Sequence, residues 1–132
     1  MEIQKPTLVQ ALKGGLISGV IAAIANGIWN LIAQSGLGIQ VPLIGIKQTT
    51  FASIIPLLLG ALLFFLLVKF TAKGSQIFTI IAVVFTILSL YGTVQPMLPD
   101  GSPTPEGFAL LTMPMHFIAG GVAIWGIHKF AK

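Results

Sequence analysis

The chain contains no cysteine and no arginine, and it carries few charges of either sign. Without cysteine it cannot form a disulfide, a thiolate nucleophile or a cysteine-ligated metal centre. Only 8% of its 132 residues are charged, whereas a soluble domain carries roughly 25%. So few charges cannot keep a globular surface in water. The sequence therefore predicts that the lipid bilayer surrounds most of the protein.

Apolar residues take the place of the missing charges: they make up 55% of the chain, and the mean hydropathy is +0.99. A helix that crosses the hydrocarbon core needs about 20 mostly apolar residues. Four stretches meet or nearly meet this length, at residues 8–33, 51–70, 77–94 and 108–127. The predicted fold is therefore an all-α membrane protein, with four transmembrane helices in one antiparallel bundle that forms a single domain over residues 1–132.

The lysines predict which way the bundle faces. With four spans, the N-terminal segment, the second connection and the C-terminal segment share one side, and six of the seven lysines lie there: Lys5, Lys13, Lys69, Lys73, Lys129 and Lys132. The other side holds Lys47, Asp100 and Glu106. Because positive residues concentrate on the cytoplasmic side of membrane proteins, we expect a plasma-membrane protein with both termini in the cytoplasm.

Small residues recur every four positions in the first apolar stretch, at Gly15, Gly19, Ala23 and Gly27. In lipid such a stripe lets another helix backbone approach closely. It therefore predicts a packing face, either within the bundle or between subunits, and Gly19 is expected to lie against a neighbouring backbone. Gly120 in the fourth stretch is predicted to be a further packing position.

Polar side chains are rare in the four stretches, and most of them fall in the same half of the membrane. His116 is the one ionisable side chain away from the ends of a predicted span, since Lys13, Lys69 and Tyr91 lie near the ends of theirs, and an ionisable group in lipid is a candidate functional residue. We expect it to point into the bundle, near Asn26, Asn30 or a hydroxyl of the third helix, because an unpaired polar group in hydrocarbon is costly. The candidate ligand-binding residues are His116, Asn26, Asn30, Ser53, Thr86, Ser89 and Thr112. They form either an outward-opening pocket or a hydrogen-bonded lock that holds the helices together.

Two details are predicted for the outer connections. The segment Val41 to Ile46 is apolar enough to lie on the membrane surface. Thr104, Pro105 and Glu106 have the order of a helix start, with a capping hydroxyl, a proline at the first helical position and an acid near the positive end of the dipole.

Several activities lack the residues they require. A proton-coupled small multidrug transporter needs a carboxylate within the membrane, and none of the four stretches contains one. An intramembrane hydrolase needs a base partner or several metal ligands, and one histidine is too few. We therefore predict a protein that is not an enzyme, with no catalytic residues, no metal ligands, no cofactor and no nucleic-acid partner.

The layout resembles an uncharacterised family of small bacterial four-helix membrane proteins. The resemblance is carried by a first helix that ends in asparagines, a Ser-x-x-Pro pair (Ser53 and Pro56) followed by Gly60, and the Met115-His116 pair in the last helix. It implies an all-helical fold in a prokaryotic membrane. It implies no activity, because the family has none assigned.

Two functions follow from these patterns. The glycine stripe and the short soluble regions favour a protein that acts through helix contacts, as a homo-oligomer or as an accessory subunit of a membrane complex. The polar cluster favours the alternative, in which a pocket in the outer half of the bundle binds or translocates a small solute or a lipid-like molecule.

Overall fold

The computed structural model describes residues 5–132, and four long helices account for most of them. These are α1 (Leu8–Leu31), α2 (Ile46–Phe70), α3 (Gly74–Ser89) and α4 (Phe108–Phe130). A π-helical turn, Ile32–Gly36, continues α1, and a 3-10 turn, Leu90–Val94, continues α3. With these turns included, all four are long and apolar enough to cross a membrane, which confirms the predicted number of membrane-capable helices.

Capping residues explain why two helices begin where they do. At the start of α1, the Thr7 hydroxyl accepts from the Gln10 N–H at 3.1 Å, and the Gln10 amide oxygen accepts from the Thr7 N–H at 2.8 Å. Gln48 likewise accepts from the Gly45 N–H at 3.2 Å, and α2 begins at Ile46. The predicted start at residue 51 was wrong because this polar first turn was assigned to the loop.

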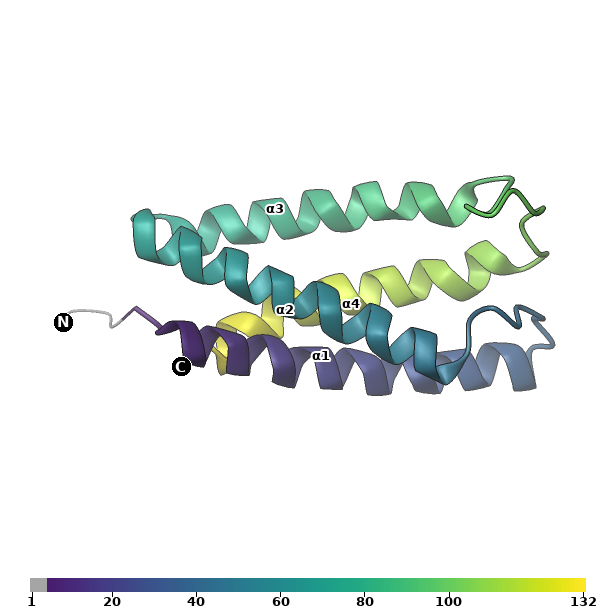
Figure 1. The fold of residues 1–132 in the computed structure, drawn as a ribbon, viewed down its shortest axis with the longest axis horizontal. Coiled ribbons are helices and arrows are strands. Elements are labelled where there is room, and N and C mark those ends of the chain that lie inside the picture. Colours follow the sequence, from purple (N-terminus) through teal and green to yellow (C-terminus); the bar gives the residue numbers. More distant parts are fainter. Residues whose placement is uncertain (1–4) are drawn as a thin grey trace.

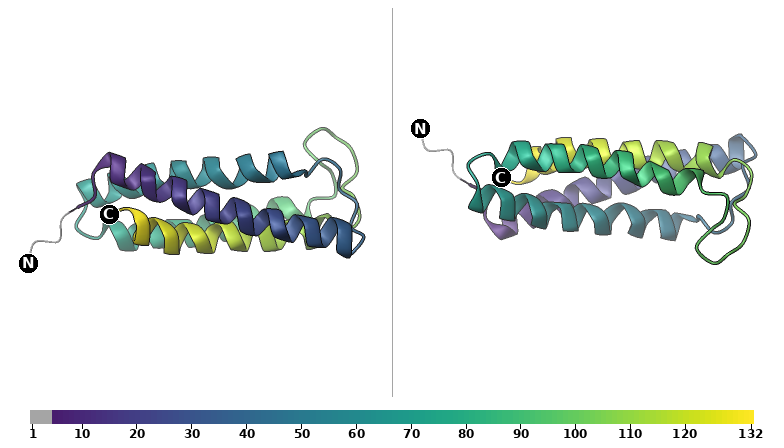
Figure 2. Two further views of the ribbon diagram at one scale, coloured as in Figure 1. Left: turned by 90° about the horizontal axis from the view of Figure 1, so that it is seen from below. Right: turned by 90° about the horizontal axis from the view of Figure 1, so that it is seen from above.

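The four helices run along the long axis of the molecule, with α2 and α4 lying between α1 and α3 (Figures 1 and 2). In α1, 39% of the apolar window is buried against other parts of the chain, compared with 11% in α3. The helix α1 is therefore closely packed, whereas α3 shares the lowest buried fraction with α4.

Glycines bring α1 close to α2, as predicted. A Cβ atom placed on Gly19 would lie 2.9 Å from the Ile54 Cα atom, and one on Gly15 would lie 2.5 Å from the Ala61 Cβ atom. Ala23 and Gly27, farther along the same stripe, are half-buried. The stripe thus packs within the chain, against α2.

A second small-residue stripe of α1 faces α4. A Cβ atom on Gly14 would lie 2.7 Å from the Ala131 backbone nitrogen, and Ser18 packs directly against Gly126. Two adjacent stripes on one helix therefore place α1 in the groove between α2 and α4.

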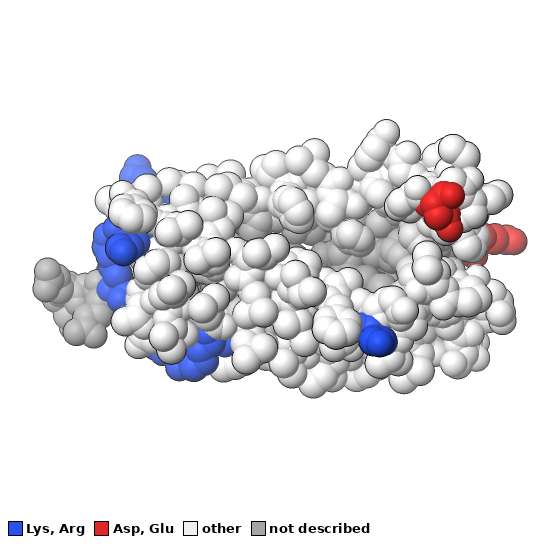
Figure 3. All heavy atoms as spheres, viewed as in Figure 1, with Lys and Arg blue, Asp and Glu red and all other residues white. Residues whose placement is uncertain are grey.

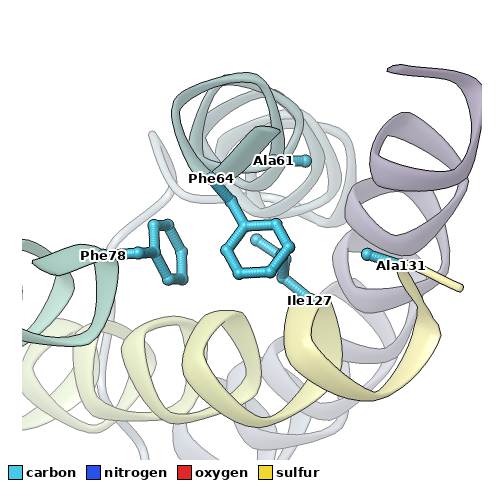
Figure 4. Packing of buried hydrophobic residues seen from close by; sticks show 5 residues of the cluster. All are labelled: Ala61, Phe64, Phe78, Ile127 and Ala131. Carbon is cyan, nitrogen blue, oxygen red and sulfur yellow. The ribbon is translucent and has the colours of Figure 1, made fainter. Parts of the chain in front are cut away.

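At the end of the bundle that holds the α2–α3 connection, bulky side chains fill the space between the helices. The rings of Phe64 and Phe78 meet edge to face with centroids 5.3 Å apart, and Ala61, Ile127 and Ala131 complete this cluster (Figure 4). The cluster joins α2, α3 and α4 at this end of the bundle and fills the space between these three helices there.

Part of the first loop packs against the helices, while Leu37 and Leu43 stay exposed. Val41 is fully buried and packs with Ala33, Ile39 and Leu111. The expectation that this segment lies on the membrane was wrong for Val41, because the side chain has an apolar site within the fold.

The second long loop also differs from the prediction. The Thr104 hydroxyl donates to the Gln95 carbonyl at 2.6 Å, so it is not free to cap a helix. The helix α4 begins instead at Phe108, after Gly107 in the left-handed region at φ +80°. The predicted start at Thr104 was therefore wrong.

Charged side chains gather at the two ends of the bundle (Figure 3). Lysines at one end donate to backbone carbonyls there: Lys5 to the carbonyl of Lys69 in the last turn of α2 at 3.3 Å, and Lys13 to the Lys132 carbonyl at 2.9 Å. At the other end, hydrogen bonds from the Ser102 hydroxyl and N–H lower the pKa of the Asp100 carboxyl, so this turn stays negative at neutral pH.

Candidate functional site

A large cavity of about 510 Å³ lies between α2, α3 and α4. Its lining is mostly apolar and runs along α3 from Phe78 to Ser89. Eleven residue steps at 1.5 Å each give a length of about 16 Å, which is roughly half of the hydrocarbon core. The surface is hollowed between α2 and α3 in the space-filling view (Figure 3).

The cavity exists because the facing positions of three helices carry small residues. Between them α2, α3 and α4 contribute Ala52, Gly60, Ala82, Ala119, Gly120 and Ala123. At Gly120 the Thr86 side chain takes the position of a Cβ atom, and the other small residues leave space that leucine or phenylalanine would fill. Phe78 lines the cavity and packs edge to face on Phe64 of α2.

His116 marks the polar end of the large cavity. Its Nδ1 atom lies 2.8 Å from the Ser89 hydroxyl oxygen, which links α4 to α3. The prediction that His116 points into the bundle is confirmed, and of its three predicted partners, Asn26, Asn30 or a hydroxyl of the third helix, the structure shows the hydroxyl. Thr86 lies one turn away, with its own hydroxyl donating to the Ala82 carbonyl at 2.7 Å.

A small cavity of about 240 Å³ lies on the other side of His116, between α1, α2 and α4. Six of its ten lining residues are polar: Asn26, Gln48, Thr49, Ser53, Thr112 and His116. Asn26 is almost fully buried there and donates to the Ser53 hydroxyl at 3.1 Å. The two cavities share Ala52, His116 and Ala119, so they adjoin at the histidine.

The model of a protein family of unknown function, DUF6069, matches residues 6–132. The chain belongs to this family. The resemblance to an uncharacterised family is thereby confirmed. No match was found among curated proteins or among solved structures.

Most of the predicted site residues of this family member lie around the two cavities. Asn26, Ser53 and Thr112 line the small cavity, Thr86 and Ser89 line the large one, and His116 lines both. Gly120, predicted as a packing residue, lies against the Thr86 side chain and also lines the large cavity. The sequence thus identified the residues that surround the junction.

Asn30 lies elsewhere, in a clamp that holds the first loop. Its side-chain nitrogen donates to the Ile44 carbonyl at 3.2 Å, and its side-chain oxygen accepts from Gln34. Gln34 also donates to the Ile44 carbonyl at 2.7 Å and accepts from the Val41 N–H at 3.1 Å. Asn30 therefore positions the loop and lines neither cavity.

Sequence reasoning missed Gln34, Gln48 and Thr49. All three fall just outside the predicted spans and were assigned to loops. The Gly45-x-x-Gln48 spacing is that of a capping box. It could have predicted that α2 begins at residue 46 and that Gln48 and Thr49 belong to this helix. No local signal identifies Gln34, because its partners come from a loop that returns to it.

Proposed function

We propose that this protein is a non-enzymatic, multi-pass membrane protein that binds a lipid-like molecule between α2, α3 and α4. The large cavity carries this proposal. Its volume of about 510 Å³ lies within the range of small-molecule sites, roughly 300–1,000 Å³. An elongated apolar space with polar groups at one end suits a molecule with a hydrocarbon tail and a polar head.

The sequence favoured a homo-oligomer or an accessory subunit through its glycine stripe. That stripe packs against α2 of the same chain, with the Gly19 position 2.9 Å from the Ile54 Cα atom. It is therefore not available to a second subunit, and assembly stays a prediction. Ligand binding is the better supported of the two functions because the cavity remains unfilled by side chains.

Filling the cavity should abolish binding. We expect Ala82→Phe, on the cavity wall, to lower labelling by a long-chain hydrocarbon diazirine at least about fivefold at the facing residues Gly60 and Ala123. Val83→Phe is the matched control, because Val83 is the exposed neighbour on α3. The protein would be labelled in vesicles and the cross-links mapped by mass spectrometry. Equal labelling of Gly60 and Ala123 in both variants contradicts the proposal.

We further propose that the helices form an antiparallel bundle in the plasma membrane, with both termini in the cytoplasm. Six of the seven lysines support this orientation. A cysteine at Ser102 should react with a membrane-impermeant maleimide on intact cells, whereas one at Ser75 should react only after permeabilisation. Ser75 is exposed at the opposite end of α3, so burial would not mask it. The reverse pattern would mean an inverted topology.

A further inference from the structure

The buried amide of Asn26 presents an acceptor that no residue satisfies. The Ser53 hydroxyl donates its one hydrogen to the Thr49 carbonyl at 2.8 Å, so it can only accept from Asn26. This fixes the amide nitrogen of Asn26 toward Ser53. Its oxygen is fully buried and has no partner among the described residues 5–132, so it can accept from a ligand in the small cavity once the side chain turns toward that cavity.

His116 presents a second acceptor by the same reasoning. The Ser89 hydroxyl donates to the Thr86 carbonyl at 2.6 Å, so it accepts the hydrogen bond from the histidine. Nδ1 of the neutral ring therefore carries the hydrogen, and Nε2 is left with a lone pair. Within residues 5–132 no side chain or backbone group donates to Nε2.

The hydroxyl groups around the small cavity cannot supply the missing donors. Thr49 donates to the Gly45 carbonyl at 2.9 Å and Thr112 to the Phe108 carbonyl at 2.8 Å, as Ser53 donates to Thr49. Each hydroxyl thus turns lone pairs, not hydrogen, toward the cavity. Among the described residues around it, the donors left are side-chain N–H groups of Asn26 and Gln48, so the small cavity holds more acceptor groups than donor groups.

The lining also argues against a charged ligand. None of its residues is a lysine, aspartate or glutamate. A phosphate or carboxylate would lack a cation, and an ammonium group would lack a carboxylate, at a depth where an unpaired charge is costly. A neutral group that donates hydrogen bonds brings no unpaired charge and can pair with the free acceptors.

From these contacts we infer that the ligand is an uncharged lipid alcohol, whose hydroxyl donates to Asn26 or His116 while its hydrocarbon chain occupies the large cavity. This inference rests on the proposed function, and it adds the chemical class of the ligand. Ala52, His116 and Ala119 line both cavities, so a hydrocarbon chain in the large cavity can bring its hydroxyl to His116.

A competition series in the unmodified protein tests the head group. The full chain, in phosphatidylcholine vesicles, is labelled with hexadecanol that carries a diazirine in its chain. Unlabelled hexadecanol, its methyl ether, hexadecanoic acid and hexadecyltrimethylammonium then compete. We expect the alcohol to compete at a concentration at least about fivefold lower than the ether, which keeps the chain and loses the donor.

Two variants test which residues cause the preference for alcohol over ether. Their outcomes also distinguish the proposal of binding in the large cavity from the inference of an alcohol head group. Asn26→Leu and His116→Phe should each reduce the advantage of alcohol over ether while labelling of Gly60 and Ala123 persists. If alcohol and ether compete equally, or if the acid or the ammonium competes best, the alcohol inference is overturned and binding in the large cavity stands. If residues of the large cavity are not labelled at all, both proposals are overturned.

Discussion

Replacing Gly15 with leucine is expected to destabilise the protein by about 3 kcal/mol or more, because the new side chain has no space. Its Cβ atom alone would lie 2.5 Å from the Ala61 Cβ atom and 2.9 Å from the Leu57 carbonyl oxygen. Neither atom is the end of a flexible side chain, so α1 and α2 would have to separate. Lipid provides no hydrophobic force to hold them together once close packing is lost.

Unfolding in sodium dodecyl sulfate, followed by tryptophan fluorescence, measures this effect. Gly121→Leu is the control, because nothing lies within 4 Å of a Cβ atom at this exposed position of α4. The control should be neutral or slightly stabilising, since glycine is a poor helix former. Gly19→Leu should behave like Gly15→Leu. If Gly15→Leu unfolds at the same concentration of sodium dodecyl sulfate as Gly121→Leu, the α1–α2 contact does not hold the bundle together.

Replacing Gln34 with leucine should also be strongly destabilising, by about 2–4 kcal/mol. The substitution removes the acceptor of the Val41 N–H and a donor to both Asn30 and the Ile44 carbonyl. An unpaired buried polar group costs about 1–3 kcal/mol. Because Ile44 lines the small cavity, loosening the loop should also expose that cavity to solvent.

Hydrogen exchange at the Val41 and Ile44 amides would report this loosening, beside the unfolding measurement. Gln76→Ala is the matched control, because Gln76 is an exposed glutamine of α3. Faster exchange confined to the first loop in Gln34→Leu is the expected result. Unchanged exchange in that loop would show that Gln34 does not hold it.

The effect of Gln34 also illustrates what sequence reasoning could not reach. The His116 prediction succeeded because it rested on a cost that applies anywhere in lipid: a polar ring needs a partner inside the bundle. The role of Gln34 depends on a loop that turns back to it, and Val41 and Ile44 lie seven and ten residues farther along the chain. The sequence offered several partners at similar separations and no means of choosing among them.

The sequence by itself determined that the chain has four helices suited to a membrane, because hydropathy over about 20 residues is a local property. It also determined that Gly19 would meet another backbone and that His116 would find a polar partner inside the bundle. Only the tertiary structure decided that the glycine stripe faces α2, that Asn30 clamps a loop, and that two cavities meet at His116. Small residues permit close packing or leave empty space with equal ease, and the distance between three helices decides which.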